Sequence, residues 1–101
     1  MRNLPVLLVS VSLASCAATK TPEAAPIPDA AMSARSKTSV ATLQRGHVVY
    51  LAHCGRCHDY VLPKDVSKED WHVVAPGMAW NAGMSEADSK ALTAYLTAAT
   101  R

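Results

Sequence analysis

The aromatic residues of this chain are confined to one region of the sequence. All five, three tyrosines and two tryptophans, lie between Tyr50 and Tyr95, and the chain contains no phenylalanine. Because aromatic side chains supply much of the apolar surface that a core buries, a packed core can form only after about residue 40. A chain of 101 residues has room for one domain at most, and we expect it over residues 41–101.

A domain of this size is a weak folding unit. About 60 residues bury only about 60% of the surface that their unfolded chain exposes. Much of the apolar content here is alanine, which packs little. We therefore expect a disulfide, a metal or a covalent cofactor to help fill the centre.

Apolar side chains in the segment 41–101 recur with helical periodicity, and no stretch shows the apolar–polar alternation of a strand. A first helix is predicted over 42–53. A second is expected to begin at the N-cap Ser67 and to end near Val74, because Pro76 disfavours a continuing helix. A third is predicted after the N-cap Ser85. The fold class is all-α, with three or four short helices.

Residues 16–40 have a different composition, dominated by Ala, Pro, Ser and Thr without an aromatic residue. Pro22, Pro26 and Pro28 disfavour a continuous helix. Such a segment buries too little surface to offset its ordering entropy, so we expect a flexible, disordered linker. The alternative is a helix over 30–37 that docks on the domain.

The start of the chain is typical of an export signal. A short positive start precedes an apolar run of ten residues, 4–13, which is too short to span a bilayer. The following Leu13-Ala14-Ser15-Cys16 resembles the lipobox of bacterial lipoproteins. The resemblance implies a signal peptide over 1–15, cleavage before Cys16 and a lipid on its thiol. The alternative is an ordinary secretory signal with an incidental cysteine.

This lipobox implies a location in the bacterial cell envelope, with the chain anchored through its lipid and facing the periplasm. Ala17, rather than Asp, follows Cys16. In Gram-negative bacteria an Asp at that position retains lipoproteins at the inner membrane, so its absence favours the outer membrane.

The strongest chemical signal is Cys54-Gly55-Arg56-Cys57-His58, a C-x-x-C-H motif. This spacing is typical of c-type haem attachment: two thiols form thioethers with the haem vinyl groups, and the neighbouring imidazole faces the iron. Gly55 and Arg56 only bridge the gap, so their identity is expected to matter little. Three alternatives are a thioredoxin-like site, which lacks its βαβ setting here, an exported disulfide, and a zinc site. The zinc site would need His47, His53 or His72 to complete its ligands.

Residues 41–101 resemble the small mono-haem c-type cytochromes. The shared pattern comprises Gly46 and Tyr50 before the motif, then Trp71 on the second helix and Tyr95 on the last helix. The resemblance implies a cytochrome c-like domain around one haem c, bound covalently through Cys54 and Cys57. It also implies that Gly46 allows the first and last helices to cross closely near Tyr95.

One subgroup of that family resembles this chain more closely. Trp71-His72-Val73-Val74, Met78 and Gly83-Met84-Ser85 match its W-x-x-V, its later methionine and its glycine–hydrophobic–serine sequence. Pro76-Gly77 departs from the pattern, because we expect it to bend the chain where the family often continues a helix.

The resemblance also implies the iron ligands. His58 is the expected proximal ligand, with its other ring nitrogen donating to a backbone carbonyl near Leu62 or Pro63. Met78 is the expected distal ligand, because thioether sulfur binds haem iron, and Met84 is the alternative. His72 is the remaining distal candidate.

A haem with two axial ligands has no vacant position for a substrate, and no set of catalytic residues is evident elsewhere. We therefore expect a membrane-tethered electron carrier rather than an enzyme, with redox proteins of the cell envelope as partners and no small-molecule substrate. A net charge of +2 argues against a nucleic-acid binder. The alternatives are a haem sensor or peroxidase-like protein with a weak sixth ligand, and a zinc-binding or disulfide-stapled lipoprotein without haem.

Overall fold

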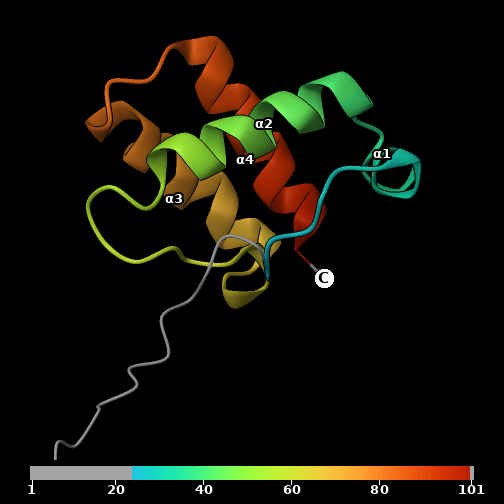
Figure 1. Cartoon of the computed structure of the whole chain (residues 1–101), viewed down its shortest axis with the longest axis horizontal. Coiled ribbons are helices and arrows are strands. Elements are labelled where there is room, and N and C mark those ends of the chain that lie inside the picture. Colours follow the sequence, from blue (N-terminus) through green and yellow to red (C-terminus); the bar gives the residue numbers. More distant parts are fainter. Residues whose placement is uncertain (1–23, 101) are drawn as a thin grey trace, which may run out of the picture.

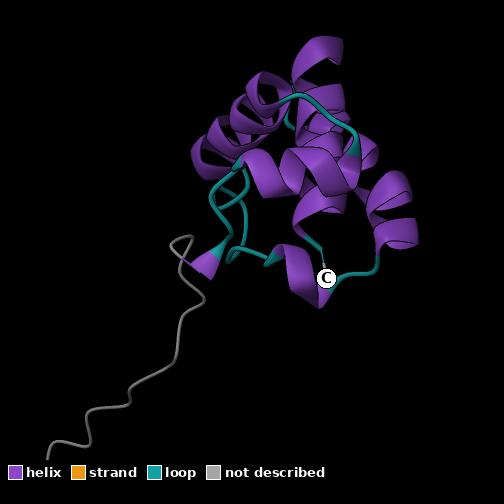
Figure 2. Cartoon of the chain, turned by 90° about the vertical axis from the view of Figure 1, so that its right-hand side faces the viewer, coloured by secondary structure: helices purple, strands orange, loops and turns teal. Residues whose placement is uncertain are grey.

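The computed structural model describes residues 24–100, so the predicted signal peptide and Cys16 lie outside the described residues. This part of the chain contains helices and loops and no strand, which confirms the all-α prediction (Figures 1 and 2). None of its helices has the length and hydropathy of a membrane span. The helices are α1 (Ala30–Ser36), α2 (Val40–His53), α3 (Lys68–Asn81) and α4 (Glu86–Ala99), with a short 3₁₀ helix η2 (Pro63–Asp65) between α2 and α3.

Each α-helix begins at a residue whose side chain accepts a hydrogen bond from a backbone N–H of the first turn. Ser39, Ser67 and Ser85 do this for α2, α3 and α4, and Asp29 does it for α1. Such caps satisfy donors that have no partner within the helix. The two caps predicted from the sequence, Ser67 and Ser85, are confirmed.

Helix α3 does not end before Pro76, so the prediction of a helix stopping near Val74 is wrong. The helix continues through Pro76 to Asn81. Proline inside a helix costs about 3 kcal/mol, because it removes one backbone hydrogen bond and crowds the preceding turn. Here Pro76 is exposed, and so is His72, whose carbonyl loses its helical partner, while Trp71, Ala75 and Ala79 lie buried along another face. Burial of that face favours the continuous helix.

Helix α4 is the element on which the other helices pack. It contacts α1, α2, α3 and η2, and its contacts with α2 and α3 are the most extensive between helices; α1 also contacts α2. Its inner face buries Leu92, Tyr95 and Leu96. Where α2 crosses it, a Cβ atom added to Gly46 would lie 2.6 Å from the Cβ of Tyr95. The close crossing expected at Gly46 is therefore confirmed.

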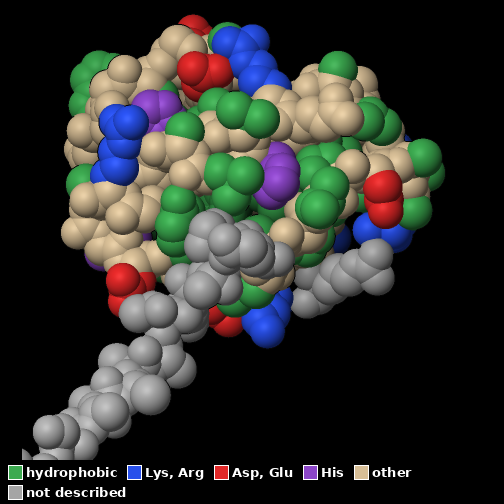
Figure 3. All heavy atoms as spheres, in the orientation of Figure 1, with side chains coloured by type: hydrophobic (Ala, Val, Ile, Leu, Met, Phe, Trp, Pro, Cys, Tyr) green, Lys and Arg blue, Asp and Glu red, His purple; other side chains and the backbone are tan. Residues whose placement is uncertain are grey.

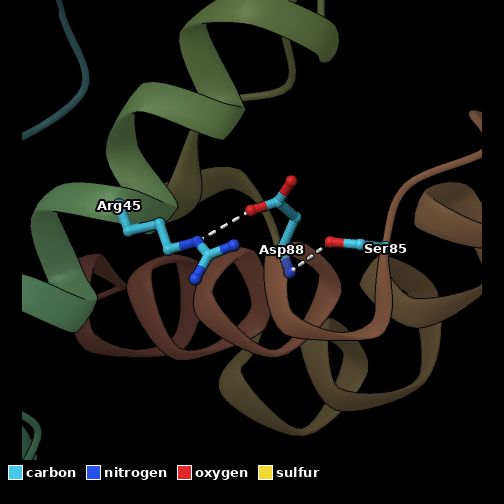
Figure 4. Close-up of polar contacts among 3 residues, drawn as sticks. All are labelled: Arg45, Ser85 and Asp88. Carbon is cyan, nitrogen blue, oxygen red and sulfur yellow. Dashed lines mark hydrogen bonds and ion pairs between the residues drawn. The ribbon is translucent and has the colours of Figure 1, made fainter.

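An ion pair joins the same two helices at the surface. The Arg45 Nε of α2 donates to the Asp88 Oδ1 of α4 at 2.8 Å (Figure 4). The backbone N–H of Asp88 donates to the Ser85 cap, so this residue connects the start of α4 to α2. Both charged groups remain partly exposed, so the pair contributes no more than about 1 kcal/mol.

The flexible-linker prediction is wrong for residues 24–40, because this segment packs on the domain. Ala25 and Met32 are buried in the core, and the Tyr95 hydroxyl donates to the Pro26 carbonyl at 2.8 Å. Helix α1 matches the alternative of a docked helix over 30–37. Composition misled the prediction: a few small or flexible apolar residues complete a core that residues 41–101 leave open.

Candidate functional site

A cavity of about 280 Å³ lies between α2, α3 and the loop that follows α2. Its walls are mainly apolar and include Trp71, Leu92 and Leu96 from α3 and α4. Five side chains selected from the sequence for their chemistry all line it. These are Cys54, Cys57, His58, Met78 and Met84.

The two motif cysteines have different environments. Cys54 caps the C-terminus of α2, where its backbone N–H donates to the Tyr50 carbonyl, and its side chain is partly buried. Burial raises the pKa of the Cys54 thiol to about 11, so this thiol stays protonated at neutral pH. Cys57 is exposed in the following turn.

His58 is exposed at the cavity wall, and its ring is oriented by a neighbouring carbonyl. Its Nδ1 lies 2.8 Å from the Asp59 carbonyl oxygen. When Nδ1 donates there, Nε2 is left as the ring nitrogen with a free lone pair. His58 can then act as a ligand through Nε2.

The prediction that His58 donates to a backbone carbonyl near Leu62 or Pro63 is wrong, because its Nδ1 lies beside the Asp59 carbonyl. The Pro63 carbonyl accepts from the Trp71 indole N–H at 2.9 Å and from the Thr100 hydroxyl at 2.8 Å. These two bonds occupy both of its lone pairs, and the Asp59 carbonyl is adjacent to His58 in the chain.

Met78 and Met84 lie in the same cavity because of how α3 ends. Gly83 has a φ of +69°, its N–H donates to the Trp80 carbonyl, and the Met84 N–H donates to the Ala79 carbonyl. These two bonds form a Schellman motif, which often brings the residue after the glycine against the last helical turns. Met84 is thereby placed beside the turn that carries Met78, and both are partly buried. Met78 itself lies within a helix rather than in the irregular segment that Pro76 predicted.

The histidines outside the motif are distributed over different surfaces. His53 lines the cavity, whereas His72 is exposed on another side of α3 and does not line it. The ring of His47 packs on Tyr95 with centroids 5.1 Å apart, and burial lowers its pKa. Within residues 24–100, no three His, Cys, Asp or Glu side chains are grouped so that they could hold a metal ion.

Two features of the site were missed from the sequence. Gly55 is not merely a bridge between thiols, because a Cβ added there would lie 2.6 Å from the Cζ of Tyr60. Asn81 and Ala82, at the end of α3, also line the cavity. Their contribution depends on α3 continuing past Pro76, which the sequence did not indicate. The other tryptophan of α3, Trp80, is 85% exposed and does not line the cavity.

Charges of both signs are interspersed on the face shown in Figure 3, and neither forms a continuous patch there. This agrees with the small net charge of +2. Comparisons of the chain with protein-family models, with curated proteins and with solved structures gave no match.

Proposed function

We propose that this protein is a membrane-tethered c-type cytochrome that carries single electrons between redox proteins of the cell envelope. The observation that supports it most strongly is the convergence of two thiols, one imidazole and two thioethers on one cavity with mainly apolar walls. Thiols at C-x-x-C-H spacing attach haem c, and imidazole and thioether sulfur are its usual iron ligands in electron carriers. The donor set therefore fits haem c in both its covalent and its axial requirements.

In this proposal Cys54 and Cys57 hold the group covalently, and His58 and Met78 ligate its iron. The Asp59 carbonyl fixes the His58 ring so that Nε2 is available for the metal. Haem c, when bound, supplies a one-electron Fe(III)/Fe(II) couple. Met84 lines the same cavity and is the alternative to Met78.

The walls of the cavity determine how strongly the bound group senses the surrounding water. Trp71, Leu92 and Leu96 are almost completely buried and surround it with apolar surface. A low local dielectric disfavours the more highly charged oxidation state and raises the reduction potential. Thioether ligation acts in the same direction, as suits a carrier in an oxidising compartment.

The proposal excludes catalysis, because two protein ligands leave no coordination position for a substrate. It places the chain in the bacterial envelope through a lipid on Cys16, facing the periplasm, with the outer membrane favoured over the inner. Residue 24 is the first described residue, and Ala25 is buried in the core. Residue 24 lies eight positions after Cys16 in the sequence, and eight residue steps span at most about 26–29 Å. An acylated Cys16 would therefore hold the domain close to the bilayer.

Visible spectroscopy of two methionine variants tests the axial ligands and hence the electron-carrier function. With Met78→Ala, we expect loss of the weak methionine-to-iron band, binding of CO to the reduced protein and a lower reduction potential. The matched control, Met84→Leu, should keep the band and resist CO. Both variants should be compared with the unsubstituted protein, produced with a periplasmic haem-attachment system.

Three other results each point to a different answer. If the effects of the two variants are exchanged, Met84 is the ligand. If the unsubstituted reduced protein binds CO readily, the sixth ligand is weak, and a haem sensor or peroxidase-like protein replaces the electron carrier. A colourless protein would leave the zinc-binding or disulfide-stapled lipoprotein.

A further inference from the structure

Two tyrosines connect helix α2 to the far end of the loop that carries the C-x-x-C-H motif. The Tyr50 hydroxyl of α2 donates to the Val61 carbonyl of the loop at 3.1 Å. In the opposite direction, the Tyr60 hydroxyl of the loop donates to the Leu51 carbonyl of α2 at 2.6 Å. We call Tyr50, Tyr60 and these two hydrogen bonds the tyrosine staple.

The chain between the two ends of the staple contains the whole motif. After α2 ends at His53, residues 54–62 form turns and bends without a regular helix. Local backbone bonds hold its beginning, where the Cys54 N–H donates to Tyr50 and the Arg56 N–H donates to His53, and its last residue, Leu62, which accepts from the Asp65 N–H. The staple therefore supplies the long-range bonds that return this loop to α2 after His58.

The two rings make the staple a packed unit as well as a pair of hydrogen bonds. Their centroids are 5.3 Å apart, and the Tyr50 ring also packs on Tyr95 at 5.8 Å. Tyr50 is 1% exposed, so one side of the staple is fixed in the core. Gly55 lies against the Tyr60 ring, where an added methyl group would meet the Cζ atom at 2.6 Å.

We infer that Tyr50 and Tyr60 are positioning residues that hold the motif loop so that Cys54, Cys57 and His58 face one cavity. Tyr50 lines that cavity itself, and Val61, whose carbonyl accepts its hydrogen bond, lines the same cavity as His58. The staple itself is defined by the two hydrogen bonds and the ring packing. Its role in orienting the haem-binding side chains rests on the proposed function. The position of the Tyr60 ring also explains why residue 55 is glycine, because a larger side chain would clash with the ring.

Hydrogen exchange of the full chain, measured by mass spectrometry, tests the staple without reference to colour or activity. Tyr60→Phe removes one hydroxyl but keeps the ring, and we expect exchange of the amides in 54–62 to become about three- to tenfold faster. Tyr50→Phe should have a similar effect. The matched control is Tyr95→Phe, which loses the hydrogen bond to Pro26 outside the loop and should leave exchange in 54–62 unchanged.

A second measurement separates positioning of His58 from general stabilisation. In the haem-loaded protein, acid releases an imidazole ligand when protons compete with iron for Nε2. If the staple positions His58, the pH of this spectral transition should rise in Tyr60→Phe and not in Tyr95→Phe. A colourless protein would refute the proposed function alone, because hydrogen exchange would still test the staple.

Gly55 provides a test of the packing. Gly55→Ala should speed exchange in the loop when Tyr60 is present, and should add little in a Tyr60→Ala background, because the clashing ring is then absent. The inference is overturned if Tyr60→Phe leaves exchange in 54–62 unchanged, if Tyr95→Phe accelerates it equally, or if the Gly55→Ala effect is the same in both backgrounds.

Discussion

Helices α2 and α4 approach each other closely at Gly46, because this residue has no Cβ atom. Gly46→Ala would place a methyl group 2.6 Å from the Tyr95 Cβ and against the Ala91 carbonyl, between two backbones that cannot both relax. We expect the free energy of unfolding to fall by about 1–3 kcal/mol, as for other overpacked cores. Chemical denaturation measures it.

The control is Gly77→Ala, at an exposed position in α3 where an added Cβ meets no atom within 4 Å. This change should stabilise the protein by up to about 1 kcal/mol, because alanine favours a helix over glycine. Equal destabilisation by the two substitutions would show that the crossing at Gly46 is not specially tight.

The buried tyrosine of the cavity wall predicts a pH dependence of stability. Burial raises the pKa of Tyr50 from 10.0 to about 12. Because the folded-state pKa is the higher one, the contribution to stability is complete below about pH 10 and is lost as the pH rises through about 12. Denaturation above pH 10 should therefore show a steeper loss of stability in the unsubstituted protein than in Tyr50→Phe. Equal losses of stability in the two proteins would show that ionisation of Tyr50 does not cause the loss.

The sequence predicted which residues supply chemical groups to the cavity more reliably than it predicted what those residues contact. The spacing of Cys54, Cys57 and His58 selected side chains that lie around one cavity. The carbonyl next to His58 and the ring against Gly55 were missed. Both depend on how the irregular loop 54–62 returns to α2, and no local pattern encodes that path.

Among the elements, α1 and the segment before it carry the clearest test of the structure. Met32 is 3% exposed in the core, so Met32→Ala should cost about 2–4 kcal/mol of the free energy of unfolding. Ile27 lies in the same segment but is 77% exposed, and Ile27→Ala should change it by less than about 0.5 kcal/mol. Thermal or chemical denaturation compares them. If both substitutions are neutral, residues 24–36 do not pack on the domain as described.

Helix starts could be predicted from the sequence more reliably than helix ends. Ser67 and Ser85 cap α3 and α4 through contacts within one turn, which a local pattern reveals. The continuation of α3 through Pro76 depends on burial of Trp71 and Ala79 against the rest of the fold. Docking of α1 has the same origin, because its stabilising contacts come from residues distant in the sequence.

At the scale of the whole molecule, the cavity lies between α2 and α3, each of which packs extensively on α4. The side chains that line it come from the end of α2, the motif loop, both ends of α3 and the inner face of α4. The sequence predicted α2, α4 and the start of α3, together with most of the cavity's chemical groups. It did not predict that one Schellman turn would bring both methionines to the same side.

The anchoring proposal also concerns the whole molecule, and Cys16 tests it. Cys16→Ser should abolish lipid attachment and membrane fractionation while leaving the visible spectrum unchanged, because the proposed ligands all lie in residues 54–84. Mass spectrometry of the N-terminal peptide and membrane fractionation measure the two effects. An unsubstituted protein that fractionates as soluble with a free Cys16 thiol would contradict the lipid anchor.

Covalent attachment of haem is the central claim, and the intact mass of the denatured protein tests it most directly. Protein made in a host with a periplasmic haem-attachment system should have the mass of the polypeptide plus one haem, even after extraction with acidified acetone. Cys57→Ala should reduce the fraction of chains that retain haem, whereas Met84→Leu should not. A bare polypeptide mass in the unsubstituted protein, with all haem removed by the extraction, would contradict the account.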